Sequence, residues 1–401
     1  MTTAAPTYTV ERIDHRAEAV VKGPDGSSMS VPVHALPGEM IVDGRCDGSS
    51  PDRIEPACRH FEACGGCVAQ HMSPAFYARW KTGLVAQALR AHGLAPAIDP
   101  LITVSPRTRR RAKFSVTTKA LGFHAAAEAT VIDLAECPVV TAKIEAALPR
   151  LRELISLLGA PNDETRIAVA DLHGGLDVVV TELKSELTAG RRSKLANFAA
   201  SHGFARLTIG DETVVTHADP RLVTSSGSIV APPDSFFQAV AEAETAIVAA
   251  VLAGLPKVKR VADLFCGLGT LSLPLARVAR VLAVDTERRL LDALVHATRH
   301  TQGLKPIEAL RRDLFREPLS AKELEGIDAV VLDPPFAGAR AQCERLAASK
   351  VKSVVMVSCH PGTLARDAKV LVGGGFDLLR VTPIDQFLWS NHVECVAVFR
   401  R

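Results

Sequence analysis

The clearest hydrophobic pattern begins at about residue 231, where short apolar runs alternate with segments of helical periodicity. Each run has the length and the branched side chains of a buried strand. Helix-like segments at 245–253 and 361–372 lie among these runs. Such alternation predicts a parallel, doubly wound α/β sheet that binds ligands at the carboxyl ends of its strands. The predicted strands are residues 260–264, 281–284, 329–332, 351–357 and 393–399.

Two earlier regions have a different pattern. Short β-type runs broken by glycine fill residues 8–45 and predict a small antiparallel barrel. Farther along, strands at 166–170 and 176–181 are predicted to form a hairpin among helices, which favours an antiparallel α+β region. A helix at 74–92 has apolar residues at helical spacing and ends before a glycine. The expected domains are residues 1–50, 51–233 and 234–401.

The composition of the chain favours some classes of protein and excludes others. The chain of 401 residues is 47% apolar, which is enough for packed cores, and its net charge of +3 means that any nucleic-acid surface must be a local patch. Its apolar runs are too short for a membrane span, and residues 1–12 have no signal-peptide pattern, so we expect a soluble, cytoplasmic protein. In such a protein, nine cysteines favour metal binding or catalysis over a disulfide framework.

Three of the cysteines lie close together in the sequence. Cys58, Cys64 and Cys67 are followed at a distance by Cys137, which precedes a proline. Two glycines between Cys64 and Cys67 let the backbone fold tightly around a metal centre. Three clustered cysteines with a remote Cys-Pro suit a 4Fe–4S cluster. Zinc is the alternative, although its sites favour separated cysteine pairs or histidines. Two histidines are rival ligands, His60 and His71.

The densest positive run, at residues 107–113, has five Lys or Arg in seven positions and leads into a strand-like segment at 114–118. Alternate side chains of a strand point to opposite faces, so some of these charges must reach solvent or a partner. Contact with RNA phosphates is one interpretation, and a solvated face is the other.

A cysteine stands where the strand at 351–357 ends. Ser358, Cys359 and His360 follow that strand, and Pro361 then opens a helix. Free backbone N–H groups and the positive end of a helix dipole are expected to lower the pKa of the Cys359 thiol and favour the nucleophilic thiolate. An inert, half-buried thiol is the alternative from this stretch alone.

Acidic residues and glycines end the other strands. Asp263 lies at the end of one strand, a Gly-x-Gly turn at 267–269 follows it, and Asp285 ends the next strand. Glycine lets the backbone approach a nucleoside, and an acid in that place accepts hydrogen bonds from ribose hydroxyls. The longer glycine pattern of dinucleotide dehydrogenases is incomplete here. With Asp313 and Asp333 after later strands, the pattern favours a methyltransferase that uses S-adenosylmethionine.

Motifs along nearly the whole chain resemble those of the RNA uracil-5 methyltransferases, in the iron–sulfur branch that forms 5-methyluridine. The most specific are C-R-H-F-E-A-C-G-G-C, D-L-F-C-G-L-G-T-L-S-L-P-L-A, D-P-P-F-A-G-A, V-S-C-H-P-G-T-L-A-R-D and N-H-V-E-C-V. At the start, A-V-V-K-G-P-D-G and H-A-L-P-G-E resemble the TRAM module, an OB-like RNA-binding domain. The resemblance implies a Rossmann-like class I methyltransferase domain, a central α+β domain and a small OB-like β-barrel. It also implies that the helix at 74–92 packs on the catalytic domain.

The resemblance implies a role for each candidate residue. Cys359 is the nucleophile that adds to carbon 6 of uracil, and Glu394 is the base that removes the hydrogen from carbon 5. The implied cofactors are S-adenosylmethionine and a 4Fe–4S cluster. The implied partner is RNA, with 23S ribosomal RNA expected and transfer RNA as the alternative, and the protein is expected to be a monomer. The cofactor or target contacts are Gln238, Phe265, Thr270, Asp285, Asp313 and Asp333, and the cluster ligands are Cys58, Cys64, Cys67 and Cys137.

Several positions depart from the family pattern. Phe336, His360 and Val240 stand where the family usually has Arg, Asn and Asn, and residues 387–390 replace F-P-H-T. We expect retained activity, but the loss of the Arg and Asn that flank the base pocket leaves the identity of the substrate open. A non-catalytic iron–sulfur RNA-binding protein and a cytosine-5 methyltransferase are the alternatives. Three aromatic residues are candidates to stack on the target base, Phe236, Phe237 and Trp389.

Overall fold

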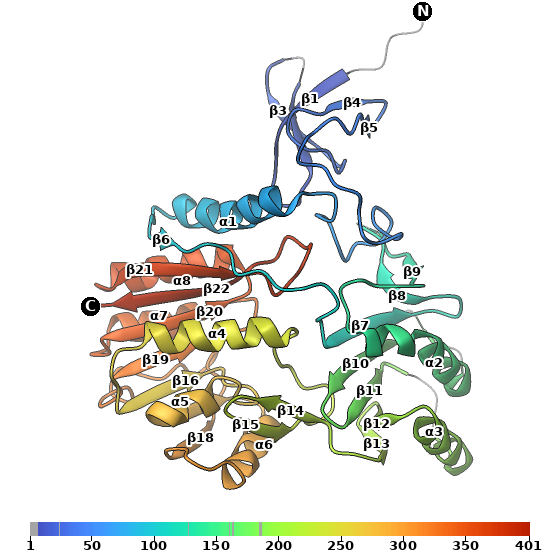
Figure 1. Ribbon diagram of the computed structural model, residues 1–401. Coiled ribbons are helices and arrows are strands. Elements are labelled where there is room, and N and C mark those ends of the chain that lie inside the picture. Colours follow the sequence, from blue (N-terminus) through green and yellow to red (C-terminus); the bar gives the residue numbers. More distant parts are fainter. Residues whose placement is uncertain (1–6, 24, 127, 160, 163, 184–186) are drawn as a thin grey trace, which may run out of the picture.

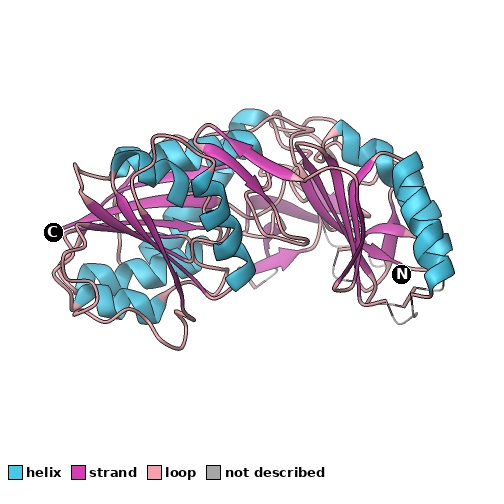
Figure 2. Ribbon diagram, turned by 90° about the horizontal axis from the view of Figure 1, so that it is seen from below, coloured by secondary structure: helices cyan, strands magenta, loops and turns pink. Residues whose placement is uncertain are grey.

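The computed structural model describes residues 7–401 except 24, 127, 160, 163 and 184–186 (Figure 1). Its strands form a five-stranded N-terminal sheet, a seven-stranded central sheet, a two-stranded hairpin and an eight-stranded C-terminal sheet. Residues 1–6 and Pro24 of the predicted N-terminal module lie outside the described residues. Seen from below, the C-terminal sheet with helices on both faces forms one lobe and the central sheet forms another (Figure 2).

The N-terminal sheet has the order β3-β2-β1-β4-β5, and every neighbouring pair is antiparallel. Its side chains form a small core of their own around Val10, Val21 and Ile41. The strands are β1 (Thr7–Ile13), β2 (Ala19–Lys22), β3 (Ser28–Val31), β4 (Met40–Val42) and β5 (Arg45–Cys46).

The central sheet has the order β13-β12-β11-β10-β7-β8-β9 and contains the predicted hairpin as β10 and β11. The prediction of a wholly antiparallel region is wrong at one pair, because β11 and β12 are parallel. Helix α3 connects these two strands, and such a crossover returns the chain in the same direction. The elements are β7 (Arg111–Val116), β8 (Leu121–His124), β9 (Val131–Asp133), α2 (Ala142–Leu158), β10 (Arg166–Leu172), β11 (Gly175–Thr181), α3 (Ala189–Ser201), β12 (Phe204–Ile209) and β13 (Glu212–Thr216).

The C-terminal sheet has the order β18-β17-β16-β19-β20-β22-β21-β6. Its first five strands are parallel, as predicted, but β22 lies antiparallel between β20 and β21. Only a loop separates β21 from β22, so the chain reverses there without a crossover helix. The strands are β6 (Ala97–Ile98), β16 (Arg260–Leu264), β17 (Arg280–Asp285), β18 (Ile307–Arg311), β19 (Ala329–Leu332), β20 (Ser353–Ser358), β21 (Asp377–Ile384) and β22 (Glu394–Arg400).

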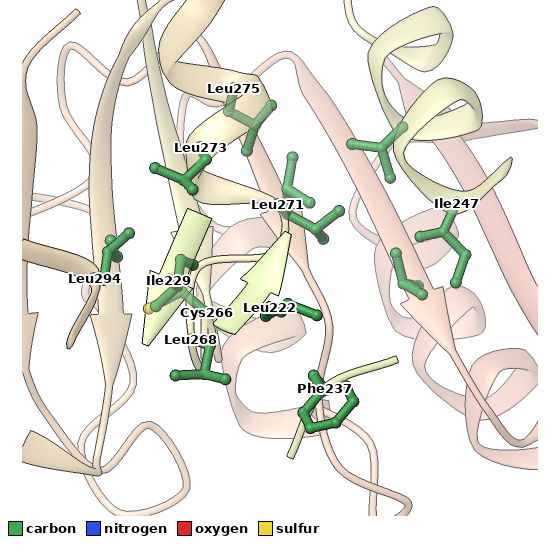
Figure 3. Close-up of a cluster of buried hydrophobic side chains, with 14 of the residues drawn as sticks. Leu222, Ile229, Phe237, Ile247, Cys266, Leu268, Leu271, Leu273, Leu275 and Leu294 are labelled. Atoms are coloured by element: carbon green, nitrogen blue, oxygen red, sulfur yellow. The ribbon is translucent and has the colours of Figure 1, made fainter. Parts of the chain in front are cut away.

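Two buried clusters cover the two faces of this sheet. On one face, Leu222 and Ile229 of the β14–β15 hairpin (Arg221–Thr224 and Gly227–Val230) point into the same cluster as Leu271 and Ile247 (Figure 3). Leu271 directly precedes α5, so this packing holds the chain where it leaves the Gly-x-Gly turn. The helices of this lobe are α4 (Ala241–Gly254), α5 (Ser272–Val278), α6 (Arg288–Arg299), α7 (Arg340–Ala347) and α8 (Pro361–Gly373).

Helix α1 (Pro74–Ala91) joins two parts of the molecule. Its Tyr77 and Trp80 pack in a cluster with Leu36, whereas Val85 and Leu89 belong to the core on the second face of the C-terminal sheet. The helix thus runs between the N-terminal sheet and the β21 edge (Figure 1). Within the part of the chain that is described, no helix is both long and apolar enough to cross a membrane.

Candidate active site

A cavity of about 620 Å³ lies at the carboxyl ends of the parallel strands. Most of the predicted site residues line it, although they come from strand ends and loops far apart in the sequence. Thr270 does not line this cavity and instead borders a smaller one of about 50 Å³ beside it. The residues of the larger cavity that the sequence predicted are Gln238, Phe265, Asp285, Asp313, Asp333, Cys359 and Glu394.

The turn after β16 has the strained backbone expected of a ligand site. Phe265 has a φ of 62°, which a non-glycine residue rarely adopts. Gly269 has a φ of 84°, and a Cβ there would lie 2.4 Å from Leu294 Cδ1. The N–H of Gly267 donates to Asp285 Oδ2 over 2.9 Å, which ties the turn to the end of β17. The turn therefore holds Phe265 and Asp285 at one wall of the cavity.

Two carboxyl groups lie beside this turn, one buried and the other, Asp333, half-buried at the cavity wall. Asp263 is fully buried and accepts a hydrogen bond from Ser272 Oγ at 2.5 Å, while its Oδ1 has no partner among the described residues. Burial raises the pKa of Asp263 to about 7 and raises the pKa of Asp333 to about 7. Such carboxyl groups suit a cationic ligand, because a nearby positive charge favours their ionised form.

Cys359 lies between the end of β20 and the start of α8, as predicted, and is half-buried. The predicted fall in its pKa is wrong for this state. Burial, followed by the charges of Glu394 and Asp333, raises the pKa of Cys359 to about 12. Burial, together with the two carboxyl groups, outweighs the effect of the helix N-terminus on this pKa. The helix is capped by His360, whose Nδ1 accepts a hydrogen bond from the Thr363 N–H at 3.1 Å.

Glu394 opens β22 and is 3% exposed. Burial and the charge of Asp333 raise its pKa well above the ordinary range. Gln386 Nε2 donates to Glu394 Oε2 at 2.9 Å and to Gln238 Oε1 at 2.7 Å, and Gln238 Nε2 donates to Asp333 Oδ2 at 3.1 Å. Gln386 was not among the residues predicted from the sequence. Its one signal was a pair of polar residues, Asp385 and Gln386, directly after an apolar strand.

Aromatic side chains surround the mouth of the cavity. Phe236 and Phe336 are 60% and 55% exposed and line it, whereas Phe237 is buried in the core (Figure 3). The ring centroid of Phe336 lies 4.4 Å from that of His360 and 6.5 Å from that of His392. Trp389 packs with the N-terminal end of α1, away from the cavity lining.

Most charges of the basic run lie near acidic side chains of the same chain. Arg107 forms an ion pair with Glu145, Arg110 pairs with Glu244 at 2.7 Å, and Lys113 lies 3.6 Å from an Asp234 oxygen. The guanidinium of Arg111 lies 5.1 Å from the centroid of the Phe236 ring. Arg107 and Lys113 still have side chains about half exposed, so they can reach RNA phosphates, whereas Arg110 is enclosed. Arg111 lies beside the active-site mouth.

A second cavity, of about 460 Å³, is lined by all four predicted cluster ligands. Burial raises the pKa of each of these thiols, that of Cys67 to about 12, and neighbouring thiols add to the effect. Among the described residues, no group of three or more His, Cys, Asp or Glu side chains converges closely enough to hold a single metal ion. His60 lines this cavity, but His71 packs beside Phe61 and His34 instead. The four cysteines are Cys58, Cys64, Cys67 and Cys137.

Known proteins that are similar to this chain are RNA methyltransferases. Residues 230–401 match the family described as tRNA (Uracil-5-)-methyltransferase. The chain is 43% identical to an uncharacterized RNA methyltransferase of Brucella suis, covering 98% of this chain and 97% of that protein. It is 32% identical to the 23S rRNA (uracil(1939)-C(5))-methyltransferase RlmD of Klebsiella pneumoniae, covering 88% of this chain and 83% of that protein.

A solved structure shares the fold across the whole chain. It is the Pyrococcus abyssi tRNA (uracil-54, C5)-methyltransferase in complex with S-adenosyl-L-homocysteine, with a TM-score of 0.75, 22% identity and coverage of 98% and 99% of the two chains. The fold and the strand-end cavity define a class I methyltransferase that depends on S-adenosylmethionine. Within that class, the chain belongs to the RNA uracil-5 methyltransferase family.

Proposed function

We propose that this enzyme forms 5-methyluridine in 23S ribosomal RNA through a covalent bond between Cys359 and carbon 6 of uracil. The observation that carries the proposal is that Cys359 and Glu394, from different elements, line one cavity with the acidic strand ends. The ribosomal target is supported by the relative named for 23S rRNA, which is 32% identical. Transfer RNA, named by the family description, is the alternative target.

In the proposed reaction, Cys359 acts as the nucleophile and Glu394 acts as the base. Carbon 5 of uracil is a poor nucleophile until the Cys359 sulfur bonds to carbon 6 and makes carbon 5 enolate-like. S-adenosylmethionine supplies the electrophilic methyl group. Carbon 5 then carries both the methyl group and its original hydrogen, so Glu394 removes that proton before the sulfur leaves. The target base must leave its stack to reach the cavity, where Phe236 and Phe336 offer exposed aromatic faces.

The protonation states of Cys359 and Glu394 favour a fixed order of ligand binding. Without ligands, the pKa of Cys359 and that of Glu394 are raised, so both groups favour their neutral forms. The positive charge of bound S-adenosylmethionine beside Asp333 would oppose this effect and favour the thiolate and the carboxylate. We therefore propose that the methyl donor binds before the RNA base reacts.

We propose that the second cavity holds a 4Fe–4S cluster. Its size and its four thiols suit a cage of iron and sulfide held by four cysteine thiolates. The cluster would tie the segment around Cys58–Cys67 to Cys137, and methyl transfer itself needs no electrons.

We also propose that the N-terminal sheet is a TRAM-like RNA-binding module. Residues 1–50, 51–233 and 234–401 form the proposed domains, and the enzyme is proposed to act as a monomer.

The proposal is tested with purified, anaerobic protein, S-adenosylmethionine carrying a labelled methyl group, and transcripts of 23S rRNA fragments and of transfer RNA. We expect 5-methyluridine in the ribosomal transcript, none with Cys359→Ala, and a stable adduct with RNA that contains 5-fluorouracil. Labelled transfer RNA alone would move the target to that RNA. Labelled 5-methylcytidine, or no methylation of any transcript, would refute the proposal.

A further inference from the structure

We propose that Gln386 is a positioning residue that holds Glu394 and Gln238 in place for the last step of the reaction. The inference rests on the proposed function, because Glu394 is its base. Gln386 lies in the loop between β21 and β22 and is 2% exposed. It does not line the cavity itself, so it acts through the two side chains that do.

The contacts of Gln386 form a continuous chain across the bottom of the site. Its Nε2 donates to Glu394 Oε2 at 2.9 Å and to Gln238 Oε1 at 2.7 Å. Gln238 in turn donates through Nε2 to Asp333 Oδ2 at 3.1 Å. An amide nitrogen has two hydrogens, so both hydrogens of Gln386 are used. One buried amide thus sets the rotamers of the base and of the neighbouring glutamine together.

This arrangement also decides the charge that Glu394 can carry. Burial and Asp333 favour the neutral acid, whereas a hydrogen bond donated to the carboxylate favours the ionised base. Gln386 supplies that bond, and its own Oε1 has no partner among the described residues. A buried amide that leaves its oxygen unpaired in order to donate twice is costly for stability, which points to a functional reason for its orientation.

Loss of this donor should stop the reaction at one identifiable point. Cys359 can still attack, and the methyl group can still be transferred, because neither step needs the Glu394 carboxylate. Removal of the carbon-5 proton then becomes slow. The enzyme should therefore remain bonded through Cys359 to a uridine that already carries the new methyl group.

The test is Gln386→Met, which keeps the length of the side chain and removes the donor. With ordinary uridine RNA and labelled S-adenosylmethionine, we expect turnover to fall at least tenfold. We also expect a labelled protein–RNA complex that survives denaturing electrophoresis. The acid limb of the pH–rate profile should move to higher pH, because Glu394 then loses its proton less readily. Affinity for S-adenosylmethionine should stay within about twofold of wild type.

A matched control variant distinguishes a positioning role of Gln386 from a contribution to protein stability alone. Gln342→Met removes another buried amide, 1% exposed, whose side chain bonds only the backbone of Leu319, at 2.8 and 3.1 Å, among the contacts described. This control should lower the melting temperature without trapping a complex. Gln386→Glu keeps the size and polarity of the side chain and should trap the same complex, which covers the case in which Gln386→Met does not fold.

The outcomes distinguish the two proposals. If the wild type methylates uridine and forms the fluorouracil adduct, but both Gln386 variants turn over normally, the role of Gln386 is wrong and the proposed function stands. A slow variant that traps no complex and shows an unchanged pH profile would also refute the positioning role. If the wild type forms no adduct, the proposed function fails and this inference fails with it.

Discussion

The ammonium of Lys81 lies 2.8 Å from Asp385 Oδ1, and both side chains are completely buried. Lys81 also donates to the backbone carbonyl groups of Phe387 and His392, and the Tyr77 hydroxyl donates to Asp385 at 2.9 Å. Helix α1 therefore holds the loop that leads from β21 to Glu394, the proposed base. Burial lowers the pKa of Lys81 and raises that of Asp385, and the attraction within the pair opposes both shifts.

Removal of one partner of this ion pair should lower the free energy of unfolding. Lys81→Met leaves the Asp385 carboxyl buried without its cation, and such changes typically destabilise by about 3–5 kcal/mol. Urea unfolding of the variant should show this loss. The double variant Lys81→Met, Asp385→Asn should recover part of it, because no charge is then left unpaired.

An exposed pair provides the control for Lys81. Lys22 and Glu11 lie 3.2 Å apart with side chains 67% and 41% exposed. Lys22→Met should change the free energy of unfolding by less than about 1 kcal/mol. Equal effects of Lys22→Met and Lys81→Met would contradict a structural role for the buried pair.

The same loop forms a wall of both large cavities. Phe387 and His392 line the active-site cavity and the cysteine cavity. The N–H groups of Val68 and Ala69, directly after Cys67, donate to the carbonyl of Trp389 at 2.8 and 3.1 Å. A change around the cysteines should therefore move a wall of the active-site cavity.

Loss of the proposed cluster should affect the RNA step more than binding of the methyl donor. For Cys67→Ser, we expect little iron and sulfide, at least tenfold less adduct with 5-fluorouracil RNA, and nearly unchanged affinity for S-adenosylmethionine. Cys343→Ser, a change at a buried cysteine outside both cavities, should keep the iron and the adduct. A colourless wild-type protein that contains zinc would contradict the cluster.

Much of the active site could be predicted because strand ends are local features. Branched apolar runs ending in Asp285, Asp333 and Cys359 mark the strands, and parallel strands bring their carboxyl ends to one edge. The reversed direction of β22 depends on a connection whose path the apolar pattern does not reveal.

Contacts between distant segments could not be predicted. Gln386 meets Gln238 across 148 positions of sequence, and the two carboxyl groups that raise the pKa of Cys359 come from other strands. The ion pair of Arg110 with Glu244 likewise joins two regions that the sequence pattern treats separately. Local periodicity places residues on elements, but it carries no information on which elements face each other.

Phe336 should contribute to the choice of RNA. It is 55% exposed at the cavity mouth, and a base stacked on an aromatic ring contributes about 1–3 kcal/mol. We expect Phe336→Ala to raise the KM for RNA about tenfold while the affinity for S-adenosylmethionine is unchanged. Leu379→Ala, at a residue 45% exposed on β21 and outside the cavity, should change neither quantity. An equal loss of affinity for the methyl donor would instead place Phe336 in the cofactor site.

The buried carboxyl of Asp263 should make the ligand-free protein less stable as the pH rises. Its pKa is raised by burial from 3.8 to about 7, so its stabilising contribution is complete below about pH 4 and is lost as the pH rises towards 7. Between pH 5 and pH 8 the ionisation of Asp263 lowers the free energy of unfolding by on the order of 2–3 kcal/mol. Asp263→Asn should remove this share of the pH dependence in urea unfolding, while Asp333 and Glu394, whose pKa values are also raised, account for the share that remains. The exposed Asp292→Asn, whose carboxylate lies 3.5 Å from Arg288, is the control and should leave it intact. S-adenosylmethionine, as a cation, should stabilise the wild type more at pH 8 than at pH 5. The same pH dependence in Asp263→Asn as in the wild type would show that Asp263 is not its source.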